Sequence, residues 1–450
     1  MTATSLPLCA CRPAVPRWVW GWLVLLHLLA LGWQLCHRQP FFPDSDRYVQ
    51  AARNLRDAGV LYALPLSEKP LQLQEYSIRP PAYPVWLWLT GGAGQGFPWG
   101  TLLLQNLLSL LNLGLALRWL VAQTGGLNQR QWALVLLLTA AAPAQFIYAN
   151  VLMSEVLLQT AVVGLWLSLV AFCTEGWQAR HLAWAAGATM LALLTKPVFG
   201  PFALLLLVLV GVISWRQRRP WLVVVAALPV VATLGWMARN EARTGYFHFS
   251  SITEINLLRY NVRGVLQTTE GPAAAEKFVH GTLAAANQRP TFAEQQQYVQ
   301  HAGMAALLRH PVAYTGQHLR GMLTLLLDPG RFDAVHFLRL SQPTTTSLLR
   351  LLNQGQYIAA AQQLQQLPVG LLLGLGLIFL ANVARLGLII RFGLTRVYPR
   401  AMRLVILGLV AYVALLTGPL GAARFVVPIL PLLLAAAGAG LPATRHLGRV

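Results

Sequence analysis

Charged side chains are scarce in this chain. Asp, Glu, Lys and Arg make up 11% of its 450 residues, whereas a soluble domain averages about 25%. Hydrophobic residues make up 56%, and the mean hydropathy is +0.54. This composition excludes an ordinary soluble domain and predicts a polytopic membrane protein. The roughly ten-residue alternation of apolar and polar residues that marks a transmembrane barrel is also missing, so the membrane segments are predicted to be helical.

Cysteines and acidic residues are few as well. The four cysteines, Cys9, Cys11, Cys36 and Cys173, lie outside the long polar segments, which excludes a disulfide framework. The Cys-x-Cys spacing at the N-terminus does not fit a zinc knuckle. There are 14 acidic residues against 34 Lys and Arg, giving a net charge of +20. Because the basic residues are dispersed between apolar runs, they indicate membrane topology and not nucleic-acid binding.

Apolar runs of the length of a membrane span recur along the chain, since a helical span needs roughly 20 mostly apolar residues. Backbone groups in lipid must be satisfied internally, so each run is expected to be a helix. The first run is interpreted as a retained anchor, because it is long and has no small-x-small cleavage site. We predict about ten spans, near 18–36, 101–121, 132–149, 152–173, 182–195, 197–215, 221–238, 367–390, 402–418 and 425–441.

The distribution of charge predicts the orientation. With the N-terminus in the cytoplasm, the segments densest in Lys and Arg lie inside, and Glu175 is the only acidic residue that falls there. We therefore predict a protein of the plasma (inner) membrane with both termini cytoplasmic. Its parts are an N-terminal transmembrane module (1–238) with a first outer loop (37–100), an extracytoplasmic helical region (239–366) and C-terminal transmembrane helices (367–450).

The extracytoplasmic region carries signals for helices. Thr291 and Glu294 have the spacing of a capping box, which predicts a helix that runs toward Arg309. Pro311 fits the first turn of the next helix, and the Asp-Pro-Gly sequence at 328–330 ends that helix. These signals predict a helical cap over the membrane module.

Two carboxylates follow the first predicted span at its outer end. Asp44 and Asp46 are two residues apart, so they could share a divalent cation or accept a hydroxyl proton. The alternative is a solvated loop in which Asp44 caps the helix that starts at Arg47. Partial desolvation at the membrane surface is expected to raise the pKa of Asp44 toward a value useful for a general base.

Further charged residues are predicted at the outer ends of the spans. Arg79 precedes two prolines that hold it extended, where it can bind a phosphate through two nitrogens or, alternatively, a lipid head group. Glu155 opens the fourth span, and a carboxylate at that depth is a functional candidate, although the helix dipole alone would favour it. Four cations share this face, and each could instead be an interfacial anchor: Arg79, Lys196, Arg239 and Arg424. Together they suit a lipid-linked phosphate.

The motifs, taken in chain order, resemble those of large integral-membrane glycosyltransferases of the GT-C fold. The resemblance is closest to the bacterial branch akin to protein O-mannosyltransferases and lipid A aminoarabinose transferases. The chain departs from that pattern at Ser45, where the best-known members carry Glu, and this makes Asp46 a candidate substitute. The matching segments are 43–48, 79–84, 154–155, 194–197, 310–314 and 424–431.

This resemblance implies an all-α, GT-C-like enzyme that moves a sugar from a polyprenyl-phosphate donor to an acceptor on the extracytoplasmic face, with inversion. Asp44 is then the catalytic base, and Asp46 orients the acceptor or holds a divalent metal together with Asp44; no other cofactor is implied. The sugar stays open, and the acceptor is a lipid, a glycan or a protein. The implied substrate-binding residues are Arg47, Tyr48, Arg79, Tyr83, Glu155, Lys196, Arg239 and Arg424.

A polytopic transporter or a flippase for lipid-linked sugars is the alternative class. Such proteins usually carry internal repeats and ionisable groups near the middle of the membrane. No repeat relates the two halves of this chain, and only Arg118 and Arg385 fall within predicted spans. The concentration of acidic residues outside the spans favours the transferase.

Overall fold

The computed structural model describes residues 14–340, 351, 357–365 and 367–442. Throughout these residues the regular structure is helical and no strand is found, which confirms the all-α prediction. Cys36 and Cys173 are free thiols, whereas Cys9 and Cys11 lie outside the described residues.

Seven helices are long and apolar enough to cross a membrane, which confirms a polytopic architecture. Their lengths and apolar composition follow the hydrophobic runs read from the sequence. They are α1 (Arg17–His37), α4 (Trp99–Thr124), α7 (Glu155–Thr174), α9 (Gly200–Gln217), α10 (Trp221–Thr244), α19 (Val369–Leu394) and α20 (Arg400–Thr417).

The predicted number of about ten spans is not confirmed. Helices α5 (Gln129–Ala140) and α6 (Pro143–Ala149) make an eighth span only if they are taken as one span bent by 56°, and Pro143 starts the second piece because it cannot continue the first. Helix α8 (Ala179–Thr195) has 17 residues, about 26 Å of helix, which is short of a roughly 30 Å hydrocarbon core. The run at 425–441 is broken at two prolines into α21 (Ala423–Val426), η5 (Val427–Ile429) and α22 (Leu430–Ala439).

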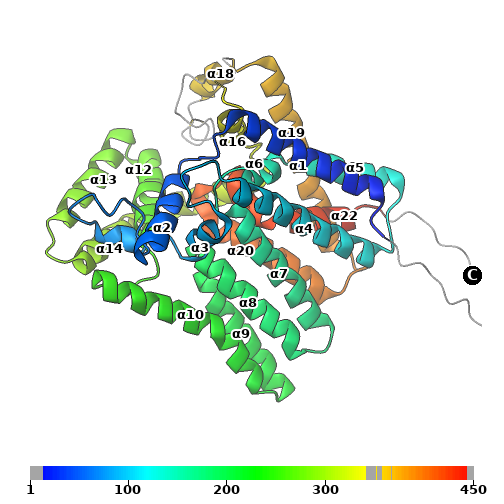
Figure 1. Cartoon of the computed structure of the whole chain (residues 1–450), viewed down its shortest axis with the longest axis horizontal. Helices are drawn as coiled ribbons and strands as arrows, with labels where there is room; N and C mark the ends of the chain where they lie inside the picture. The colour runs from blue at the N-terminus through cyan, green and yellow to red at the C-terminus, as the bar shows by residue number, and fades with distance from the viewer. Residues whose placement is uncertain (1–13, 341–350, 352–356, 366, 443–450) are drawn as a thin grey trace, which may run out of the picture.

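The core of the bundle forms around α7, which packs against α4, α8, α20 and η5 and lies near the middle of the molecule (Figure 1). Trp166 of α7 is fully buried and meets Trp119 of α4 edge to face at 5.0 Å. Every residue of the short helix α22 is buried, as expected for a helix that is apolar on all sides. The segment that carries Arg424 is therefore anchored in the centre of the fold.

The first connection, residues 38–98, contains α2 (Ser45–Ala58), η1 (Leu73–Tyr76) and α3 (Ala82–Thr90). Tyr48, Val49 and Ala52 lie on one face of α2 and pack in one core cluster with Tyr83 and Leu87 of α3. The apolar face of α2 is therefore packed against α3.

The long connection between α10 and α19 contains further helices: α11 (Ile252–Asn256), a π-helical turn η3 (Leu257–Val262), α12 (Arg263–Thr269), α13 (Pro272–Asn287), α14 (Phe292–Arg309), α15 (Pro311–Leu327), α16 (Arg331–Phe337) and α18 (Tyr357–Gln365). Helix α14 begins where the Thr291 hydroxyl accepts a hydrogen bond from the Glu294 N–H at 3.2 Å, and α15 spans Pro311–Leu327 as predicted. Helices α12, α13 and α14 gather at one end of the molecule (Figure 1).

Helix α15 crosses the chain after α20 with backbone against backbone. A Cβ added to Gly321 of α15 would overlap the carbonyl oxygen of Gly418, and one added to Gly421 would overlap that of Gly321. Only glycine permits this approach, so these three residues fix where the long connection meets the segment that leads into α21.

We predict that Gly321→Ala destabilises the protein, because the new methyl group must push two backbone segments apart. Overpacking of this kind costs about 1–3 kcal/mol. The measurement is the melting temperature of the purified protein in detergent. Gly316→Ala on the same helix is the matched control, since a Cβ there meets nothing within 4 Å; equal melting temperatures for the two variants would contradict the proposed contact.

Candidate active site

Asp44 is the centre of the site. It occupies the N-cap position of α2, but its side chain makes no capping hydrogen bond. Instead, Arg79 Nη2 donates to Asp44 Oδ1 at 2.8 Å and Arg424 Nη2 donates to Oδ2 at 2.9 Å. One carboxylate therefore binds two guanidinium groups from distant parts of the chain, and the alternative of a solvated helix cap is wrong.

A second ion pair lies beside the first. Glu155, in the first turn of α7, is fully buried and accepts a hydrogen bond from Lys196 Nζ at 2.6 Å. Arg424 Nε lies 3.6 Å from the same Glu155 oxygen, so Arg424 joins the two pairs. We call Asp44, Arg79, Glu155, Lys196 and Arg424 the ion cluster; with three cations and two carboxylates it has one positive charge in excess.

The ion cluster forms because successive helices alternate in direction. Glu155 opens α7, Lys196 follows α8 and Arg424 precedes the buried α22, so these residues meet at one end of the bundle only if α8 returns alongside α7. The two helices do pack against each other. The sequence prediction that Arg79, Lys196 and Arg424 share a face with the carboxylates agrees with these contacts.

Aromatic rings support the cations. The Arg79 guanidinium lies 4.6 Å from the ring centre of Tyr48, and Phe425 lies beside both Arg424 (4.8 Å) and Lys196 (5.5 Å). Cations over aromatic faces at these distances are attracted by the ring quadrupole. Tyr83 is fully buried, packs edge-on against Tyr48 at 5.0 Å and donates to Gln105 Oε1 at 2.8 Å; it therefore supports Tyr48 from behind.

The structure reverses the expectation for the acidity of Asp44. Burial alone would raise the pKa of Asp44, but the positive charges of Arg79 and Arg424 and their hydrogen bonds outweigh it and hold the pKa well below its ordinary value. The predicted rise is therefore wrong for this state of the protein. While both arginines bind it, the Asp44 carboxylate is a weak proton acceptor.

Buried donors and acceptors in the ion cluster are incompletely used. Arg79 Nε, Arg424 Nε and Glu155 Oε2 are all buried without a hydrogen-bond partner. Buried polar atoms are normally hydrogen-bonded. Unused capacity beside a partly exposed carboxylate, 29% accessible at Asp44, is what a polar ligand could take up.

Three other predicted residues lie apart from the ion cluster. Arg47 binds Glu75 at 3.1 Å. Arg239 donates to the carbonyl oxygens of Tyr76 (2.6 Å) and Leu61 (3.2 Å), so it holds the first connection and does not join the other cations. Asp46 is exposed and has no hydrogen bond or ion pair within the described part of the chain.

The metal prediction for Asp44 and Asp46 gains no support from the geometry of the site. Across the described residues, no group of three or more His, Cys, Asp or Glu side chains could hold a metal ion. Both Asp44 oxygens accept from arginine. A shared divalent cation stays a prediction.

One carboxylate near the site was missed by sequence reasoning. Asp333 in α16 is buried, and its Oδ1 accepts a hydrogen bond from the Tyr148 hydroxyl at 2.9 Å. Burial raises the pKa of Asp333 to about 7, although the Tyr148 bond opposes the rise. No motif surrounds Asp333, so the one signal in the sequence is the scarcity of acidic residues.

Asp333 predicts a pH dependence of stability. Below about pH 4 the carboxyl group is protonated in both the folded and the unfolded chain; between pH 4 and 7 it ionises only in the unfolded chain, so stability falls as the pH rises. Asp333→Asn keeps an acceptor for Tyr148 and cannot ionise. We expect the variant to be more stable than the wild type at pH 8, by up to roughly 4 kcal/mol, and equal to it near pH 4. Melting curves at both pH values test this, and a stability difference that does not change with pH would contradict it.

Comparisons with known proteins complete the description. No protein-family model matches the chain, and a search of curated proteins gave no match. Similar solved structures include ArnT from Cupriavidus metallidurans bound to undecaprenyl phosphate, with 18% identity over 95% of this chain and 78% of that one and a TM-score of 0.38. They also include the oligosaccharyltransferase AglB from Archaeoglobus fulgidus in complex with an inhibitory peptide and a dolichol-phosphate, with 14% identity over 94% of this chain and 50% of that one and a TM-score of 0.44. A third is the arabinosyltransferase EmbB from Mycobacterium smegmatis, with 14% identity over 96% of this chain and 42% of that one and a TM-score of 0.35.

These three structures are GT-C-fold glycosyltransferases, the class that the sequence motifs predicted. Their TM-scores lie below 0.5, so they assign no role to any residue of this chain. The roles below rest on the geometry of the ion cluster.

Proposed function

We propose that this protein is a membrane glycosyltransferase that moves a sugar from a polyprenyl-phosphate donor to an acceptor hydroxyl on the extracytoplasmic face, with inversion at the anomeric carbon. The observation that carries the proposal is the Asp44 carboxylate held between Arg79 and Arg424. It pairs a base with phosphate-binding groups at the end of an apolar helical bundle.

The charge of the ion cluster suits this donor. A polyprenyl-phosphate sugar is a phosphodiester with one negative charge, which would neutralise the single excess positive charge of the cluster. When the sugar leaves, the phosphate gains negative charge, and Arg79, Lys196 and Arg424 stabilise that charge as it develops. Guanidinium groups can bind two phosphate oxygens at once, and the unused Nε atoms of Arg79 and Arg424 supply further donors.

Donor binding would reverse the effect of the two arginines on the pKa of Asp44. A phosphate that draws Arg79 and Arg424 to itself releases the Asp44 carboxylate, whose pKa then rises toward its ordinary value. Asp44 accepts the proton of the acceptor hydroxyl while that oxygen forms a bond to the anomeric carbon. The bond from the anomeric carbon to the phosphate oxygen breaks, and its electron pair leaves with the phosphate.

The remaining predicted residues take supporting places in this proposal. Tyr48 supports Arg79, and the Arg47–Glu75 ion pair fixes α2 against η1. Asp46, exposed two residues from the base, orients the acceptor or would hold a divalent metal together with Asp44. The acidic residues outside the predicted spans support an extracytoplasmic site, in a protein of the inner membrane.

We predict that Asp44→Asn lowers sugar transfer by at least about 100-fold, because general-base catalysis typically contributes that much or more. Binding of polyprenyl phosphate should stay the same or tighten, since both arginines are freed. Purified protein in nanodiscs is incubated with radiolabelled polyprenyl-phosphate sugars, and released lipid phosphate is measured. Asp57→Asn is the matched control, because Asp57 is exposed and its ion pair is with the neighbouring Arg56, away from the ion cluster.

Full activity of Asp44→Asn would refute its role as the base. The alternative class has a different signature: a transporter or flippase in proteoliposomes would move the labelled lipid between leaflets without cleaving the bond between sugar and phosphate.

A further inference from the structure

Arg385 lies inside the membrane span α19 and is buried, yet it forms no ion pair within the described residues. Its Nη2 donates to the carbonyl oxygen of Leu138 and its Nη1 donates to Asn382 Oδ1, both at 2.7 Å. A charged side chain within a span is costly and is seldom retained without a role. The structure therefore raises the question of what the Arg385 contact to Asn382 supports.

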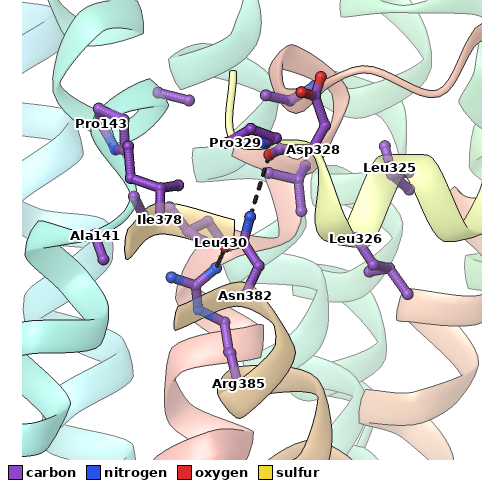
Figure 2. A pocket seen from close by; sticks show the side chains of 14 residues that line it. Ala141, Pro143, Leu325, Leu326, Asp328, Pro329, Ile378, Asn382, Arg385 and Leu430 are labelled. Atoms are coloured by element: carbon purple, nitrogen blue, oxygen red, sulfur yellow. Dashed lines mark hydrogen bonds between the residues drawn. The ribbon is translucent and has the colours of Figure 1, made fainter. Parts of the chain in front are cut away.

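Asn382 also contacts the backbone at the C-terminal end of α15. Because Arg385 occupies the Asn382 oxygen, the amide nitrogen must point the other way, where it donates to the carbonyl oxygens of Leu327 (3.3 Å) and Asp328 (3.1 Å). Figure 2 shows Asn382 between Arg385 and Asp328, at the edge of a small cavity. The side chains of Arg385 and Asn382 thus connect a membrane span to the backbone at the residue that ends α15.

Asp328 connects this chain of contacts to the ion cluster. Its Oδ2 accepts a hydrogen bond from the Ala423 N–H at 2.8 Å, and its Oδ1 accepts from the Gly330 N–H at 3.0 Å. Ala423 is the first residue of α21, where a helix has unpaired N–H groups that need an acceptor. The carboxylate caps α21 from another part of the chain, one residue before Arg424.

We propose that Asp328, held by Asn382 and Arg385, is a positioning residue that orients Arg424 in the ion cluster. Helix α21 has only four residues and cannot fix its own direction, because isolated short helices are not stable. The cap at Ala423 therefore helps to set where the Arg424 guanidinium lies relative to Asp44. The same contact ties the long connection, through α15, to the site that would bind the phosphate.

This inference rests on the proposed function in one respect: it assigns Arg424 to the donor phosphate. A simple structural role for Asp328 makes a different prediction, because loss of a general stabilising contact acts in the same way whether or not Arg424 is present. Two positions that act through one group are instead non-additive. A double-mutant cycle between Asp328 and Arg424 separates the two.

The cycle uses Asp328→Ala, Arg424→Ala and the double variant, with farnesyl phosphate as the probe and tryptophan fluorescence as the readout of binding. We expect Asp328→Ala to weaken binding about tenfold in the wild-type background and by less than about twofold in the Arg424→Ala background. Asp328→Asn, which keeps one acceptor oxygen, should recover part of the loss. Asp57→Ala serves as the control for loss of an exposed carboxylate.

Arg385 gives a second arm of the experiment. Arg385→Gln should weaken binding in the same direction as Asp328→Ala, whereas Arg391→Gln, at an exposed position on the same helix, should not. Equal losses from Asp328→Ala in both backgrounds would overturn the proposal. If Asp328→Ala does not fold, Asp328→Asn takes its place in the cycle.

The melting temperatures of the same four proteins keep the inference distinct from the proposed function. If the wild type binds no farnesyl phosphate and transfers no sugar, the proposed function fails. Non-additive melting temperatures would then still support the orientation of Arg424 by Asp328, and additive ones would overturn it.

Discussion

The ion pair between Asp44 and Arg424 is the interaction on which the rest of the site depends. It joins the first connection to α21, near the other end of the sequence. Arg79 pairs with the same carboxylate, and Glu155 lies beside the same arginine. Removing one member of such a buried group leaves a charge without a partner, which costs more than the pair contributes. The helix ends of α2, α7, α8 and α21 are therefore held in one arrangement by a shared electrostatic constraint.

This constraint also separates what the sequence could predict from what it could not. The gathering of Arg79, Lys196 and Arg424 near the carboxylates was predictable, because alternating spans bring every second helix end to the same face. Which cation pairs with which carboxylate was not predictable from the sequence. The distance between two side chains depends on their rotamers and on how far each helix is shifted along its axis relative to its neighbours. For that reason the low pKa of Asp44 was missed, and Arg239 was grouped with the cations although loop carbonyl oxygens bind it.

The predicted number of about ten spans is not confirmed for a related reason. Hydropathy marks a run as apolar but does not tell whether lipid or protein surrounds it. Helix α22 is apolar and wholly buried, so its sequence matches that of a span although protein surrounds it. It follows the segment that carries Arg424 and anchors that segment in the core. Asp328 was recognised only as the end of a helix, since its partner Ala423 lies far along the chain.

The central claim is that a lipid-linked phosphate replaces the Asp44 carboxylate as the partner of Arg79 and Arg424. The most direct test is an experimental structure of the protein with a bound polyprenyl phosphate. The account predicts phosphate oxygens within hydrogen-bond distance of both guanidinium groups and a released Asp44 side chain. A phosphate bound elsewhere, with Asp44 still held by both arginines, would contradict it.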